Sequence, residues 1–161
     1  MHPVTISEEP ERHVAALAHS GPDAEIGTTF EALQTRVAAT GLASKTEGLV
    51  AVYPEPDTET DTGPRVYAGV VLAPHLLVPD GFTAVILPAG SYATCFHRGP
   101  HDGLGAIWTW LTEDWAAEAG EVPAETPRFE LYLNRPSSTP RDQLETMLFL
   151  PQEEGDFNGP L

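Results

Sequence analysis

The sequence predicts an α+β domain in which two pseudo-symmetric βαββ repeats share one curved antiparallel sheet, with two helices packed on its outside. A duplication is the first observation behind this prediction, because paired residues recur at a constant spacing of 78 positions. The second observation is that apolar periodicity alternates between strand-like and helix-like within each copy. Two copies are too few for a stacked solenoid, so we expect them to face each other around a central cleft. The matched pairs are His19 and His97, Gly21 and Gly99, Pro22 and Pro100, Gly27 and Gly105, and Leu33 and Leu111.

The first repeat covers about residues 3–75 and has the order strand, helix, strand, strand. A Gly-Pro turn follows its first main strand, and apolar residues at helical spacing mark its helix. An acidic loop rich in Pro and Thr joins its last two strands, and we expect this loop to be solvated and mobile. The predicted elements are a short run at 4–6, strands at 12–18, 48–53 and 65–73, a helix at 28–39 and the loop at 54–64.

The second repeat covers about residues 80–151 and follows the same plan. Leu104, Trp108, Leu111 and Trp115 fall on one face of a helix that Gly120 can end. The other predicted elements are a short run at 82–87 and strands at 91–96, 127–133 and 144–150, followed by a loosely held acidic tail at 152–161. The length of 161 residues fits a single domain over 1–161 that can bury a real core.

Composition limits the classes of partner. The chain has 24 acidic and 8 basic residues, which gives a formal charge of −16. Such a charge repels nucleic acid and anionic membranes, and no stretch approaches the roughly 20 apolar residues of a membrane span. Cys95 is the one cysteine, and the first residues do not resemble a signal peptide. We therefore expect a cytoplasmic protein that binds neither nucleic acid nor membrane, as a monomer or a homodimer.

No metal site and no cofactor are expected. His97 and His101 are four residues apart, but Gly99 and Pro100 between them prevent a helix. No Cys or acidic pair has a zinc-like spacing, and the chain lacks a phosphate-binding loop and a dinucleotide fingerprint.

Glu130 is the leading functional candidate, because it interrupts an apolar strand. Strand geometry places Glu130 and Tyr132 on one face and Phe129, Leu131 and Leu133 on the other. We expect the Phe129 side to face the helices, so that Glu130 and Tyr132 line an open concave face. A carboxylate beside an aromatic ring suits a cationic aromatic guest. The alternative, a solvated strand residue on a wet face, stays open.

Other aromatic residues are candidate walls of the same site. Tyr53 ends the first-repeat strand that corresponds to the Glu130 strand, and Ala51 stands there in place of the glutamate. Tyr67, Trp110 and Phe149 are further candidates, whereas Trp108 and Trp115 are assigned to the core.

A known family has a similar series of segments, which correspond here to residues 87–93, 97–104 and 127–134, to Leu111 and Trp115, and to residues 148–151. In these segments the second repeat resembles the GyrI-like small-molecule-binding superfamily, the effector-binding domain of many AraC- and MerR-type regulators, whose fold is also SOUL-like. The resemblance implies two βαββ modules around a cleft, with a buried acidic residue that recognises cationic, aromatic, drug-like molecules. The Phe-Glu-Leu-Tyr segment places Glu130 at that position. Met147 departs from the pattern, because a second acidic residue is expected there.

Three functions follow as hypotheses. The first is a stand-alone protein that senses or sequesters hydrophobic, cationic aromatic compounds, including antibiotics, with Glu130 as the charge partner. The second is a hydrolase that opens cyclopropane-bearing genotoxins, with Glu130 and Tyr132 as catalytic residues. The third is an acidic modulator of a DNA-processing enzyme such as gyrase. The resemblance implies the last two, because stand-alone family members include such hydrolases and gyrase-modulating proteins.

Overall fold

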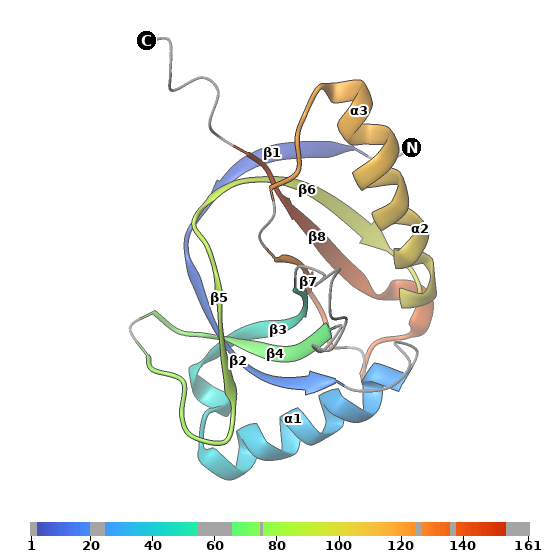
Figure 1. Ribbon diagram of the computed structural model, residues 1–161. Coiled ribbons are helices and arrows are strands. Elements are labelled where there is room, and N and C mark those ends of the chain that lie inside the picture. Colours follow the sequence, from blue (N-terminus) through green and yellow to red (C-terminus); the bar gives the residue numbers. More distant parts are fainter. Residues whose placement is uncertain are drawn as a thin grey trace, which may run out of the picture.

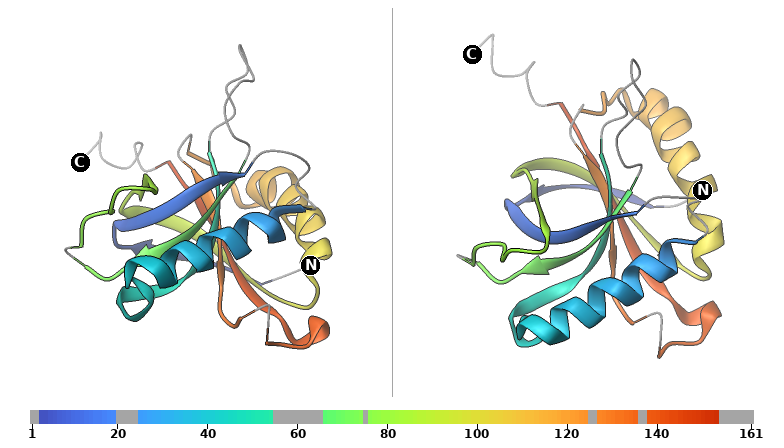
Figure 2. Two further views of the ribbon diagram at one scale, coloured as in Figure 1. Left: turned by 90° about the horizontal axis from the view of Figure 1, so that it is seen from below. Right: turned by 60° about the horizontal axis from the view of Figure 1, so that its bottom comes forward.

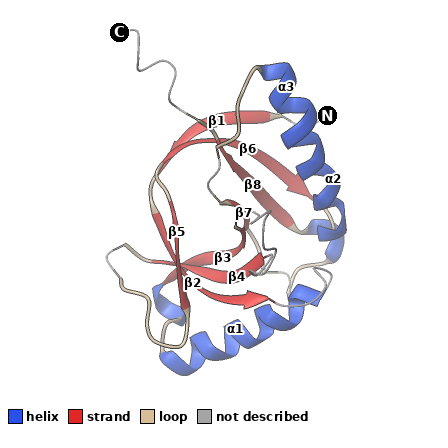
Figure 3. Cartoon of the chain, in the orientation of Figure 1, coloured by secondary structure: helices blue, strands red, loops and turns tan. Residues whose placement is uncertain are grey.

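The computed structural model describes residues 3–19, 25–54, 66–74, 76–124, 127–135 and 138–153. In these ranges the chain forms one antiparallel eight-stranded sheet and two long helical segments, so the predicted α+β class is confirmed (Figures 1 and 3). The predicted turn at 21–22, nearly all of the acidic loop at 54–64 and most of the tail at 152–161 lie outside the described residues.

The strands run in the order β1-β6-β8-β7-β3-β4-β2-β5 across the sheet. The first half of the chain supplies β1 (Val4–Glu9), β2 (Arg12–His19), β3 (Thr46–Tyr53) and β4 (Val66–Leu72). The second half supplies β5 (Thr83–Leu87), β6 (Gly90–Arg98), β7 (Arg128–Tyr132) and β8 (Glu145–Pro151).

The strand order is the same from either edge once the two halves of the chain are exchanged. The first strand of each half pairs with the other half, β1 with β6 and β5 with β2. β3 and β7 meet at the centre, where Ala51 lies opposite Glu130. This arrangement agrees with a duplicated unit, while the repeat boundaries at about 75 and 80 stay predictions.

The first helical segment is α1 (Ile26–Thr40), and the second is α2 (Leu104–Thr109), a π-helical stretch (Trp110–Trp115) and α3 (Ala116–Ala119). Short 3-10 turns lie at Ala43–Lys45, His101–Gly103 and Arg141–Gln143. Gly41 and Gly120 follow the two segments in left-handed conformations, with φ of 76° and 71°, which end the helices at little steric cost. No helix of the described residues is long and apolar enough to cross a membrane.

Both helical segments lie on the outside of the curved sheet, as predicted (Figure 1). Leu33 and Val37 of α1 pack in one core with side chains of β2 and β4. Trp108 and Leu111 pack in a second core with side chains of β6 and β8. The N-terminal ends of α1 and α2 approach each other, and the helices diverge from there (Figure 2). We call this side of the sheet the helix face.

The opposite side, which we call the inner face, is filled rather than open. Its side chains form a third core that includes Phe129 and Phe149, whose rings stack with centroids 4.5 Å apart. The Arg12 guanidinium lies over both rings. The expectation of an open concave face away from the helices is therefore wrong, because the curved sheet packs its inner side chains against one another.

Candidate functional site: a buried glutamate among aromatic side chains

Glu130 lies in the middle of β7, between Ala51 of β3 and Leu148 of β8. Leu148 belongs to the core beneath α2, so this register places Glu130 on the helix face. The predicted alternation is correct, since Phe129 lies on the other side of the strand. The predicted direction is wrong, because Glu130 faces the helices and Phe129 the inner face. Leu133 lies beyond the end of β7 and is 46% exposed, so it does not belong to either packed face.

Three aromatic side chains donate hydrogen bonds to the Glu130 carboxylate. The Trp108 indole N–H lies 2.6 Å from Oε2, the Tyr53 hydroxyl 3.0 Å from Oε2 and the Tyr132 hydroxyl 3.1 Å from Oε1. The Glu130 side chain is only 2% exposed, which excludes the alternative of a solvated strand residue. We call Glu130, Trp108, Tyr53 and Tyr132 the glutamate cluster.

The position of Glu130 alters the proton affinities in the cluster. Burial raises the pKa of Glu130 above its ordinary 4.5, while the three hydrogen bonds and the charge of Arg128 oppose this rise. Burial also raises the pKa of Tyr132 well above 10.0, and the charge of Glu130 adds to that increase. Tyr132 therefore remains a protonated donor at neutral pH.

Arg128 lies at the edge of the glutamate cluster, two residues before Glu130 and on the same side of β7. Its guanidinium carbon is 4.9 Å from the centre of the Trp108 ring and 5.9 Å from that of Tyr53. Arg128 and Tyr53 are partly exposed, whereas Glu130 beneath them is buried. The outer edge of the cluster is thus a cation over two rings, and its centre is a carboxylate.

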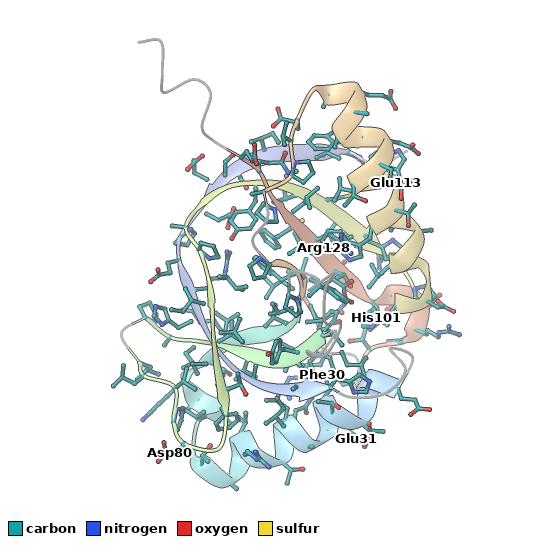
Figure 4. The ribbon with its side chains drawn as sticks, in the orientation of Figure 1. Phe30, Glu31, Asp80, His101, Glu113 and Arg128 are labelled. Atoms are coloured by element: carbon teal, nitrogen blue, oxygen red, sulfur yellow. The ribbon has the colours of Figure 1, made fainter. Side chains whose placement is uncertain are left out.

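Tyr132 connects the cluster to both helices. The His101 ring, from the turn before α2, stacks on Tyr132 with centroids 4.8 Å apart, and the Phe30 ring of α1 contacts Tyr132 edge-on at 5.6 Å. His101 and Phe30 lie between the two helices, with Arg128 nearer the middle of the sheet (Figure 4). Burial lowers the pKa of His101 below its ordinary 6.5, so its ring is neutral at neutral pH.

A family model for the GyrI-like small molecule binding domain matches residues 2–153. The chain belongs to this GyrI-like family. Solved structures similar to this GyrI-like domain include the C-terminal domain of EcmrR, with a TM-score of 0.70 at 15% identity over 96% of this chain and 99% of that one. In a DNA complex of EcmrR, the match covers 95% of this chain but only 58% of that chain.

Two further structures similar to this GyrI-like domain are those of a ligand-bound protein and of a hydrolase. One is SAV2435 bound to tetraphenylphosphonium, with a TM-score of 0.67 at 14% identity over 98% of each chain. The other is a hydrolase from Listeria innocua, with a TM-score of 0.64 at 15% identity over 94% of this chain and 92% of that one. At these identities, the likenesses establish the shared fold.

The structure brings together only some of the residues that the sequence suggested for this GyrI-like site. Tyr53 and Tyr132 contact Glu130 directly. Tyr67 and Phe149 belong to the inner-face core with Phe129, so they cannot be walls around Glu130. Trp110 is partly buried against the core beneath α2, and a role for it in the site stays a prediction.

Four residues near Glu130 were missed by sequence reasoning: Trp108, Arg128, His101 and Phe30. Trp108 was correctly assigned to the core, at 6% exposure, but its N–H donor reaches the carboxylate. Strand alternation could have found Arg128, because residues two apart in a strand share a face. The placement of His101 and Phe30 near Glu130 depends on how the helices approach β7, and no local sequence pattern predicts that approach.

Proposed function

We propose that this GyrI-like domain binds a hydrophobic organic cation beside Glu130. The observation that carries the proposal is a 2%-exposed carboxylate held by hydrogen-bond donors on three aromatic rings. A positive charge near such a carboxylate gains an ionic interaction, and the faces of the rings attract cations further. The structure of SAV2435 with tetraphenylphosphonium supports this ligand class within the shared fold.

The burial of Glu130 favours a lipophilic cation over a small hydrated one. A small cation would have to give up its water to reach the carboxylate, and that desolvation costs several kcal/mol per ion. An organic cation with shielded or delocalised charge is weakly hydrated, and its apolar groups can cover the rings of Trp108, Tyr53 and Tyr132. The formal charge of −16 adds a general, salt-screened attraction for cations.

The proposal is tested by titrating the protein with tetraphenylphosphonium, using calorimetry and the fluorescence of its tryptophans. We expect Glu130→Gln to bind it about 10- to 100-fold more weakly than wild type, because a charge-assisted interaction contributes about 1.5–3 kcal/mol. Glu118→Gln is the matched control, since it removes an equal charge from an exposed position on α3. Equal affinities for wild type and Glu130→Gln would contradict the proposal.

Hydrolysis is a second candidate function, favoured by the raised pKa of Glu130 and by the hydrolase that shares this fold. In this reaction Glu130 would accept a proton from water as the water attacks a strained cyclopropane ring, and the Tyr132 hydroxyl would orient the substrate. The proton then passes to the ring carbon that leaves, so the product is the substrate plus one water. Mass spectrometry of a cyclopropane-bearing aromatic compound should show this adduct with wild type and not with Glu130→Gln.

A further inference from the structure

Arg128 occupies the position that the proposed function assigns to the ligand. Its guanidinium carbon lies 4.9 Å from the Trp108 ring centre and 5.9 Å from the Tyr53 ring centre, within the range of about 6 Å for cation–π attraction. These same two side chains donate hydrogen bonds to Oε2 of Glu130. A cation in this place therefore faces both rings and feels the carboxylate charge beneath them.

Arg128 is held in this place by its contacts with the two rings and not by a direct ion pair. Within the described ranges, the ion pairs involve Arg12, His13 and Arg141, and none involves Arg128. Glu130 attracts Arg128 through space, but its carboxylate oxygens are hydrogen-bonded to the three aromatic donors. Arg128 is partly exposed, on a flexible stem. The guanidinium can therefore move into water without breaking a direct ion pair.

We infer that Arg128 is a tethered cation that covers the Trp108 and Tyr53 rings in the free protein and leaves when a lipophilic cation binds. This inference rests on the proposed function and identifies what sets its specificity. While Arg128 is in place, its charge cancels that of Glu130, so a monovalent cation gains little net attraction. A ligand must replace the contacts of Arg128 with larger ones of its own, which favours bulky, poorly hydrated cations over small ones.

The chemistry of the arginine side chain suits this role. A guanidinium is planar and weakly hydrated and stacks on aromatic faces, so it resembles an organic cation more closely than a lysine ammonium does. Its tether to β7, two residues from Glu130, gives it a high local concentration at the rings. The site is thereby closed to weak cationic ligands without the need for a separate lid.

The test compares tetraphenylphosphonium binding by wild type and Arg128→Ala in calorimetric titrations. We expect the variant to bind about tenfold more tightly, because one cation–π competitor of about 1–2 kcal/mol has been removed. Arg36→Ala is the matched control, since Arg36 is an exposed residue of α1 that donates to the Gly81 carbonyl and its loss changes the net charge equally. Equal or weaker binding by Arg128→Ala would overturn this inference alone.

A second measurement follows Arg128 directly in wild type, by the NMR signals of its side chain. Ring currents from Trp108 and Tyr53 should shift these signals upfield in the free protein, and saturation with tetraphenylphosphonium should return them toward solvent values. Signals that stay ring-shifted in the complex would show that Arg128 does not leave and would overturn the inference. If neither wild type nor Arg128→Ala binds tetraphenylphosphonium, both the proposed function and this inference fail.

Discussion

On each face of the sheet an arginine side chain lies over two aromatic rings, but the two arginines have different surroundings. On the inner face, Arg12 lies 5.4 Å from the Phe129 ring centre and 5.1 Å from that of Phe149, and it pairs with Glu9 at 2.8 Å. On the helix face, Arg128 lies over Trp108 and Tyr53, whose polar groups point to Glu130. The two phenylalanine rings beneath Arg12 have no polar groups.

This difference distinguishes the structural role of Arg12 from the ligand-recognition role that we propose for the site of Arg128. Arg12 pairs directly with the Glu9 carboxylate while it lies over the two phenylalanine rings, so its charge is balanced within the packed core of the inner face. Arg128 has no ion-pair partner within the described residues, and the carboxylate that attracts it is hydrogen-bonded to other side chains. We therefore expect the Arg12 guanidinium to stay in place and the Arg128 guanidinium to be replaceable by another cation.

The largest expected effect is on the inner face. Phe129→Ala should lower the free energy of unfolding by about 3–5 kcal/mol, because Phe129 is fully buried, stacks on Phe149 and contacts Tyr92 edge-on. Urea denaturation measures this loss. The folded fraction of the variant should retain the wild-type affinity for tetraphenylphosphonium, since the truncated side chain points away from Glu130. A parallel loss of affinity would show that the two faces are not independent.

A smaller effect is expected on the helix face from Trp108→Phe. This change removes the 2.6 Å hydrogen bond to Glu130 and leaves a buried carboxylate with one donor fewer, which costs about 1–3 kcal/mol in urea denaturation. The pKa of Glu130 should rise further, because the Trp108 hydrogen bond lowers it. Carbon-13 NMR of the Glu130 carboxyl measures that shift.

Trp115→Phe is the matched control for that experiment. Trp115 lies on the same helical segment and packs, partly buried, against the same core as Trp108, but no hydrogen bond from it is found within the described residues. The control should therefore leave the pKa of Glu130 unchanged. A similar rise with both variants would mean that general loosening of the core, and not the lost donor, moves the pKa.

The comparison of the two faces also explains which features of the site could be predicted from the sequence. The period of two in residues 129–132 correctly predicted that Glu130 and Tyr132 share a face. It could not predict which face meets the helices, because Phe129 is 0% and Glu130 2% exposed, so β7 is buried on both sides. A strand buried on both sides has no polar face to identify, and its direction depends on the pairing with β3 and β8.

Long-range contacts account for the residues that were missed or misplaced. Tyr67 and Phe149 are aromatic strand residues like Tyr53, and only the register of the sheet separates them from the glutamate cluster. The i, i+4, i+7 spacing correctly assigned Trp108 to a buried helix face. That spacing contains no information about what the indole N–H meets across the core, which here is a carboxylate 22 residues later in the chain.

The smallest expected effect is the dependence of the helix face on pH. The pKa of Glu130 in the folded protein lies above 4.5, so its contribution to stability is fully present below about pH 4.5 and is lost as pH rises through the folded-state pKa. Each pH unit by which the pKa is raised corresponds to about 1.4 kcal/mol. Cation affinity should change in the opposite direction, because only the ionised carboxylate attracts the ligand.

Stability and tetraphenylphosphonium affinity should therefore diverge as pH rises from 4.5 through the folded-state pKa of Glu130. Among the groups around the carboxylate, Tyr132 stays protonated because its pKa is raised, and burial keeps the pKa of His101 below 6.5. Arg128 remains charged throughout, although burial lowers its pKa below the usual value of an arginine. Glu130→Gln should remove the pH dependence of affinity that follows this one carboxyl, in parallel titrations at each pH. If the variant kept the wild-type pH profile, a group other than Glu130 would be responsible for the charge recognised by the ligand.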